Sequence, residues 1–229
     1  MGKSKHRVKD IKNLLIVEGA TDSSFFKELC NILDLGVFVF VATPKEIGGT
    51  FNSKTHAFKA LDDHLRQLND SKIERIAIVV DADAEKHNQG VSCTKQCVAE
   101  IAKKHGFTPP ESDTKNSCLF QHKDGLNPFG LWIMSNNDNE GALEDWLSLC
   151  ISREQESLFE YAKTCVSALP EQPLFKPLHQ AKAEIATWLA WQEKPGHGLY
   201  YCVEAGLLDE TAQQYQALVS WLRAVFSPT

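Results

Sequence analysis

The stretch IERIAIVVDADAEKHNQG, residues 73–90, decides the fold of this chain. It holds an apolar run from Ile76 to Val80, short and rich in β-branched residues, which predicts a strand buried on both faces. The run ends in Asp81, and Asp83 follows two residues later. Because residues two apart in an extended chain face the same way, both carboxylates are expected to point into one pocket.

Strands and helices alternate around this stretch. The expected order is strand 14–17, a helix capped by Thr21 or Asp22, strand 36–42, helix 54–68, strand 73–83 and helix 94–106. Such alternation is typical of an α/β protein, in which helices flank a mostly parallel, Rossmann-like sheet.

The hydrophobic patterns change from strand-like to helical along the second half of the sequence. Two further strands are expected at 118–123 and 129–135, and a helix begins near Leu143. After about residue 154, helical patterns dominate, as in 181–192 and 210–226, with one possible strand in LYYCV, residues 199–203. We therefore predict an α/β core over 11–150 and a helical C-terminal extension over 151–229 that packs on it.

Composition narrows the class of protein. The chain has 229 residues, a net charge of −6 and seven cysteines in no disulfide-like spacing. This charge does not suit a protein that coats DNA, although the basic start MGKSKHRVKDIK could contact phosphate. We expect no membrane segment and a cytoplasmic location, because no long apolar run occurs and the cysteines suit a reducing compartment.

Acidic residues follow three of the expected strands. Parallel strands present their carboxyl ends at one edge of a sheet, so these acids are expected to meet there. They are Glu18, then Asp81 and Asp83, then Asp138, Glu140, Glu144 and Asp145. Close carboxylates repel unless a cation neutralises them, and oxygen ligands suit Mg²⁺ or Mn²⁺. The sequence therefore predicts a metal platform at the end of the buried strand.

Simpler interpretations of these residues stay open. Asp83 can be a turn former or helix cap, and Glu144 with Asp145 can be the acidic first turn of a helix. Lys45 and Lys54 flank a Gly-Gly turn and are candidates for phosphate contacts. A zinc site at His87, Cys93 and Cys97 lacks a second ligand pair nearby, which favours ordinary cysteines on a helix face.

Two segments resemble the motifs of Toprim domains. LLIVEGATDSSFF, residues 14–26, resembles the first motif, in which a strand ends in Glu-Gly and a spacer and Asp follow. IAIVVDADAE resembles the second, a strand that ends in Asp-x-Asp. Most of the chain also resembles a bacterial Toprim-like family of unknown function with a helical tail, related to the Toprim domains of OLD-type nucleases. Ser135-Asn136-Asn137 departs from the Pro-Asp-Asn turn of that family.

The resemblance implies a Toprim-like fold and a function. It implies that Glu18 is a general acid/base and metal ligand and that Asp81 and Asp83 hold Mg²⁺ or Mn²⁺. Gly19 and Asp22 belong to the same motif and would support the site, as would Asp138 and Glu140, while Glu144 and Asp145 are candidates for a second metal or for a supporting shell. The implied activity is metal-dependent phosphoryl transfer, in a nuclease that acts on DNA or RNA.

Two other functions remain possible on sequence alone. A non-catalytic Toprim-like module would bind a metal, a nucleotide, a protein partner or a second copy of itself without cleaving nucleic acid, and the negative net charge favours it. A flavodoxin-like or receiver-like fold also places acids after parallel strands, but the Glu-Gly start and the late helices do not suit it.

Overall fold

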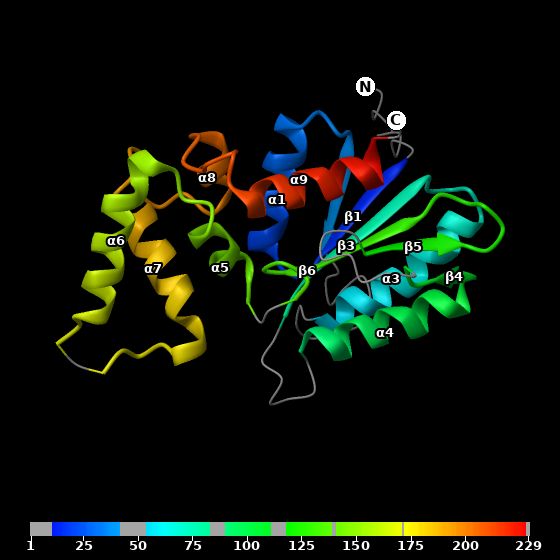
Figure 1. Ribbon diagram of the computed structural model, residues 1–229, viewed down its shortest axis with the longest axis horizontal. Helices are drawn as coiled ribbons and strands as arrows, with labels where there is room; N and C mark the ends of the chain where they lie inside the picture. The colour runs from blue at the N-terminus through cyan, green and yellow to red at the C-terminus, as the bar shows by residue number, and fades with distance from the viewer. Residues whose placement is uncertain are drawn as a thin grey trace, which may run out of the picture.

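One twisted sheet forms the centre of the molecule. The computed structural model describes residues 11–41, 54–82, 90–110, 118–138, 141–170 and 172–227. Within these ranges the sheet has six strands in the order β2-β1-β3-β6-β5-β4 (Figure 1). Their bounds are β1 (Asn13–Val17), β2 (Val37–Val41), β3 (Arg75–Asp81), β4 (Phe107–Thr108), β5 (Cys118–His122) and β6 (Phe129–Met134). The predicted α/β class, a mostly parallel sheet flanked by helices, is confirmed.

The parallel part of the sheet explains the unbroken apolar runs of the sequence. β2, β1, β3 and β6 are parallel neighbours, whereas β5 and β4 are antiparallel additions at one edge. β1 and β3 lie inside the sheet, and helices cover both faces, so both faces of these strands are buried. Their carboxyl ends come side by side because the two strands are paired in parallel, with Val17 opposite Val79.

Two layers of helices cover the sheet. The helices within the described ranges, not all of which touch the sheet, are α1 (Ala20–Ile32), α3 (Lys54–Asn69), α4 (Val91–Lys104), α5 (Leu143–Ser148), α6 (Arg153–Ser167), α7 (Gln180–Leu189), α8 (Tyr200–Glu204) and α9 (Gln213–Phe226), with a short 3-10 turn at Pro177–His179. Alternate residues of β1 face opposite layers: Leu15 packs with α1 and α9, and Leu14 packs with α3 and α4. Figure 1 shows these two layers on either side of the strands.

The C-terminal helices divide into two groups. α6 and α7 pack against each other, away from α3 and α4, whereas α9 returns to the sheet beside α1 (Figure 1). Trp221 of α9 is buried against Trp132 of β6, with ring centroids 5.5 Å apart. The division of the chain at residue 150 stays a prediction, and α9 belongs to the same core cluster as β1 and β3.

The possible strand at LYYCV is wrong, because residues 200–204 form the helix α8. Tyr201, Cys202 and Val203 are all buried. A half-exposed strand would bury every second residue, whereas a helix in a tight corner can bury three in succession. Here the neighbouring helix α1 decided the structure, and local propensity did not. None of the described helices is both long and apolar enough to cross a membrane.

Gly130 shows how closely α9 approaches the sheet. A Cβ atom at this position of β6 would lie 2.5 Å from Cγ2 of Val225 and 2.9 Å from Cζ2 of Trp221. Both neighbours are buried side chains with little room to move. We expect Gly130→Ala to lower the free energy of unfolding by about 1–3 kcal/mol, because the extra methyl group overpacks this contact.

Urea unfolding followed by circular dichroism measures this effect. Gly198→Ala is the matched control, because its added Cβ would meet the nearest atom, Cδ1 of Tyr200, at an ordinary 3.6 Å. Equal unfolding midpoints for the two variants would contradict the close packing of α9 on β6.

Candidate functional site

The candidate site lies where β1 and β3 end. Glu18 directly follows β1, and Asp81 is the last residue of β3. The backbone N–H of Asp81 donates a hydrogen bond of 2.9 Å to Oε1 of Glu18. Two acids 63 residues apart in the sequence therefore meet at one edge of the sheet, as the strand pattern predicts.

Asp22 joins these two acids from the first turn of α1. Helix α1 begins after Gly19, whose backbone N–H donates a 2.9 Å hydrogen bond to Oδ2 of Asp22. The predicted cap at Thr21 or Asp22 is therefore wrong: Gly19 is the capping residue, and Asp22 reaches back to it. Glycine suits this position because a Cβ atom would stand only 3.1 Å from Oδ2 of Asp22.

A folded-back turn brings the fourth acid, Glu144, to the same place. Beyond β6 the chain pairs with the end of β3: the backbone N–H of Gly141 donates to the carbonyl of Ala82 at 3.1 Å, and that of Ala82 donates to the carbonyl of Gly141 at 3.0 Å. Buried Asn137 holds the turn, since its Oδ1 accepts the N–H of Ile133 at 2.6 Å. Helix α5 then starts next to β3, with Glu144 in its first turn.

Glu144 and Asp145 have different surroundings although they are neighbours in sequence. The side chain of Glu144 is only 12% exposed, and its charge acts on both Asp22 and Asp81. Asp145 instead accepts the backbone N–H of Ala142 at 2.7 Å, which caps α5. Asp138 is exposed in the turn before them. Of these acids, the structure brings Glu144 to the site.

Electrostatics shows how closely the four acids interact. Burial, followed by the charges of Asp22, Glu18 and Glu144, raises the pKa of Asp81 to about 8. Burial also raises the pKa of Asp22 to about 6, although its hydrogen bond from Gly19 opposes the shift. Asp81 therefore binds a proton at neutral pH, and the site gains stability from any cation that enters it.

Lys182 is the cation that acts on this cluster in the part of the chain that the structure describes. Its charge lowers the pKa of both Asp22 and Asp81, against the larger effects that raise them. Its Nζ lies 4.0 Å from Oε1 of Glu144, and half of its side chain is exposed. Sequence reasoning missed Lys182, because a single lysine on an amphipathic helix carries no local signal of this contact.

The remaining candidates lie elsewhere or outside the described residues. Lys54 is the first residue of α3, and its charge acts on the thiol of Cys97 in α4. The structure does not describe Asp83, Glu140, Lys45 or His87. Cys93 and Cys97 both lie on α4.

The donor chemistry of the site fits a hard divalent cation. All four acids offer carboxylate oxygens, and both the burial and the repulsion that raise the pKa of Asp81 are opposed by added positive charge. Among the described residues, however, no group of three or more His, Cys, Asp or Glu side chains is close enough to hold one ion. A cation held here would need further ligands, such as water, phosphate or a residue outside the described ranges, among which Asp83 is the candidate from the sequence.

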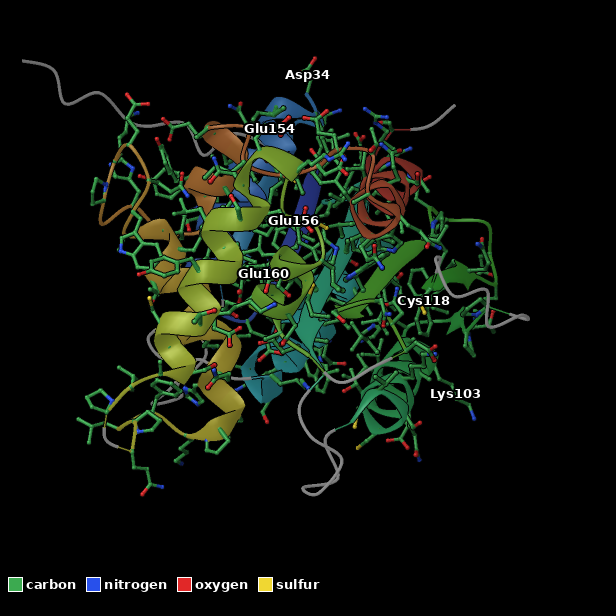
Figure 2. The ribbon with its side chains drawn as sticks, turned by 60° about the vertical axis from the view of Figure 1, so that its left-hand side comes forward. Asp34, Lys103, Cys118, Glu154, Glu156 and Glu160 are labelled. Atoms are coloured by element: carbon green, nitrogen blue, oxygen red, sulfur yellow. The ribbon has the colours of Figure 1, made fainter. Side chains whose placement is uncertain are left out.

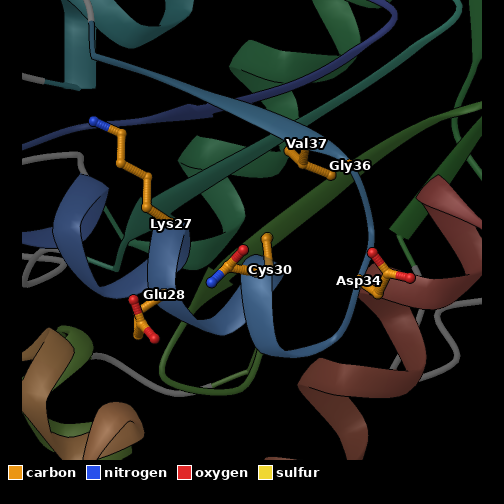
Figure 3. Close-up of a pocket in the computed structure, with 7 residues that line it drawn as sticks. Lys27, Glu28, Cys30, Asp34, Gly36 and Val37 are labelled. Atoms are coloured by element: carbon orange, nitrogen blue, oxygen red, sulfur yellow. The ribbon is translucent and has the colours of Figure 1, made fainter.

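A separate cavity lies at the other end of α1. It has a volume of about 420 Å³ and is lined by residues from the C-terminal part of α1 and the start of β2. Figure 3 shows Lys27, Glu28, Cys30 and Asp34 around it. Since a helix rises 1.5 Å per residue, this cavity is on the order of 10–15 Å from the carboxylates at the start of α1. It does not belong to the candidate site.

Comparison with known proteins identifies the family to which this chain belongs. A family model described as "Protein of unknown function (DUF3226)" matches residues 12–227. No curated protein matches the chain, and no solved structure matches it. The matched range includes all four acids of the site and helices α1 to α9.

Proposed function

We propose that this chain, which belongs to the DUF3226 family, is a divalent-metal-dependent phosphoryl-transfer protein that hydrolyses nucleic acid. One observation carries the proposal: Glu18, Asp22, Asp81 and Glu144 converge at one sheet edge, where burial and, after it, repulsion from the other three acids raise the pKa of Asp81 to about 8. Keeping repelling carboxylates together destabilises the fold, so their convergence is expected to serve a ligand. The ligand that relieves this repulsion most directly is a divalent cation.

The Toprim-like identity of the fold is part of this proposal. It rests on the two sequence motifs, and the pairing of β1 with β3 supports it, because that pairing sets the motif residues Glu18 and Asp81 side by side. We assign Mg²⁺ or Mn²⁺ binding to Asp81 and Asp83, with Glu144 in support. A bound divalent cation supplies positive charge to the phosphoryl oxygens of the substrate.

Each described acid then has its own task. Glu18 is assigned proton transfer, and the N–H of Asp81 holds one of its oxygens in position. Asp22 stays tied to Gly19, so it keeps the start of α1 close to the site. Asp81 would release its proton on holding a cation, because a carboxylate ligand is deprotonated.

The surface charge limits where nucleic acid can approach. Glu154, Glu156 and Glu160 are exposed along α6 (Figure 2). Glu156 and Glu160 lie one turn apart, but Glu160 is paired with Lys163 at 2.7 Å, so the negative charge that would repel phosphate along this helix is partly neutralised. We also propose a cytoplasmic location, which the seven free cysteines support.

Titration of Mg²⁺ and Mn²⁺ into the protein by calorimetry, with cleavage assays on plasmid DNA and single-stranded RNA, tests the proposal. We expect both ions to bind and to support cleavage, and Glu18→Gln to lose cleavage while it keeps metal binding. If the wild-type protein binds the metal but cleaves neither substrate, the proposed nuclease activity is wrong and the protein is a metal-binding module.

The affinity for Mg²⁺ is expected to depend on pH in a defined direction. Because the pKa of Asp81 is about 8, metal binding must displace a proton below that pH. The association constant should therefore rise by up to about tenfold per pH unit from pH 6 and level off above pH 8. Calorimetry in buffers with different ionisation enthalpies counts the released proton. An affinity that is flat across this range would contradict the assignment of Asp81 as a ligand.

A further inference from the structure

A second cavity adjoins the carboxylates. It has a volume of about 390 Å³, within the range of cavities that bind small molecules. Four segments form it: the first turns of α1 and α5, one face of α7, and the loop before α8. Glu144 lines this cavity and also acts on Asp81, so the cavity opens beside the candidate site.

Helix α7 gives the cavity a charged end and an apolar end. Lys182, Ala186, Leu189 and Ala190 all line it, at the spacing of one helix face. The cation stands at the start of this stripe and the apolar residues follow. A rise of 1.5 Å per residue separates Lys182 from Leu189 by about 10 Å. A ligand that fills the cavity therefore needs an anionic group at one end and an apolar body at the other.

The charged end, which Lys182 shares with Glu144, is suited to a phosphate group once a cation neutralises the carboxylates. Nζ of Lys182 is 4.0 Å from Oε1 of Glu144, a distance that makes only a weak ion pair. With half of the side chain exposed, the ammonium group can turn to an added anion. Thr21 lines the same end and is exposed.

The apolar end is suited to a flat ring. Leu189 and Leu199 are 5% and 6% exposed and form its floor, while Ala186 and Ala190 are too small to fill the space. His197 stands at the wall with a fixed ring, because Nδ1 is hydrogen-bonded to the hydroxyl of Tyr200 at 2.5 Å. Among the described residues, Nε2 of His197 has no hydrogen-bond partner, so it can bond to a polar edge of the ring.

We infer that this cavity binds a single nucleotide unit, with its phosphate at Lys182, where a divalent cation would neutralise the neighbouring carboxylates, and its base over Leu189 and Leu199. The inference rests on the proposed function and narrows its substrate class. A cavity of about 390 Å³ has room for one nucleotide but not for two paired nucleotides with their sugars and phosphates, so the nucleotide must be free, at a strand end, or out of the stack. Single-stranded nucleic acid is therefore the expected substrate.

Equilibrium binding of AMP, adenosine and inorganic phosphate to the full chain tests the inference, with and without Mg²⁺. We expect AMP to bind more tightly than either part alone. Lys182→Gln should weaken the binding of AMP about tenfold and leave the binding of adenosine unchanged, because it removes one charged contact to phosphate. Ala186→Phe should weaken the binding of both AMP and adenosine at least about tenfold, because the phenyl ring fills the apolar end of the cavity.

Two control variants lie outside the cavity. Lys103→Gln removes an exposed lysine near the end of α4 (Figure 2), and Ala224→Phe adds a ring at an exposed position of α9. Both should bind AMP like the wild type. The inference is overturned if the wild type binds neither AMP nor adenosine, or if Lys182→Gln or Ala186→Phe binds AMP with unchanged affinity.

A short oligoadenylate distinguishes the two sources of the nucleotide. Tighter binding than AMP assigns the cavity to the end of a strand, and equal binding assigns it to a free mononucleotide. The proposed reaction can fail separately from this inference. If Mg²⁺ neither tightens AMP binding nor supports cleavage, the phosphoryl-transfer proposal falls, whereas adenosine binding and its loss in Ala186→Phe still establish the cavity.

Discussion

Asp81→Asn is expected to abolish metal-dependent cleavage, by about 10³-fold or more, while the metal-free protein becomes more stable. The loss follows because the variant removes a proposed ligand at the centre of the carboxylates. The gain follows because asparagine keeps the shape of the side chain and stays neutral, whereas Asp81 must either take up a proton or bury its charge when the chain folds. Few variants lose activity and gain stability together, so this pair of results separates a functional role from a structural one.

The stability gain has a predicted pH dependence. The folded state holds the Asp81 proton up to a pKa of about 8, whereas the unfolded chain releases it near 3.8. Between these values the folded wild type binds more protons, so its stability falls as pH rises through this window. The advantage of Asp81→Asn therefore grows from pH 4 and is largest at pH 8 and above. At pH 8 and above we expect Asp81→Asn to raise the free energy of unfolding by about 1–3 kcal/mol. This is less than the whole pKa shift would give at about 1.4 kcal/mol per unit, because water and side chains relax around a buried charge.

Urea unfolding at several pH values, with EDTA present, measures this gain, and the cleavage assay measures the loss. Asp124→Asn, at an exposed turn between β5 and β6, is the control and should change neither. If Asp81→Asn is less stable than the wild type at pH 8, the carboxylates do not repel as the structure indicates.

Trp221→Ala is expected to destabilise the protein by about 3–5 kcal/mol, a large part of the stability of a domain this size. Trp221 is 1% exposed and fills the space between α9, Trp132 and Gly130. Removing its ring leaves a cavity in the layer of helices that covers β3 and β6. The neighbouring side chains can refill that cavity only in part, because the sheet behind them is rigid.

Trp221→Phe provides the matched comparison. It keeps most of the ring and removes a buried indole N–H that has no hydrogen-bond partner among the described residues. We expect it to cost less than half of the free energy lost in Trp221→Ala. Thermal and urea unfolding give both values. A loss below about 1 kcal/mol for Trp221→Ala would mean that α9 contributes little to the core.

Local sequence pattern predicted the structure of a segment where burial alone decided that structure. The apolar runs of β1 and β3 are continuous because helices bury both faces of these strands, so strand position and parallel class could be predicted from local pattern. Glu18 and Asp81 could be paired in advance for the same reason, because neighbouring parallel strands end at one edge. Where two causes compete, as in LYYCV, packing against α1 overrode the local preference for a strand.

Glu144 and Lys182 needed the tertiary structure. Glu144 and Asp145 are adjacent on α5 and point about 100° apart, so which of them faces Asp81 depends on how the helix docks against β3. Lys182 reaches the site because α7 packs beside α5, a contact between distant segments.

The sequence by itself therefore determined the α/β class, the central strands and the two acids at their ends, because local burial patterns encode them. Only the tertiary structure decided that Asp22 and Glu144 join these acids, that Asp145 caps a helix, and that Lys182 borders a cavity beside them. The physical reason is that strand burial repeats along the chain, whereas the orientation of a docked helix depends on residues far from it in sequence.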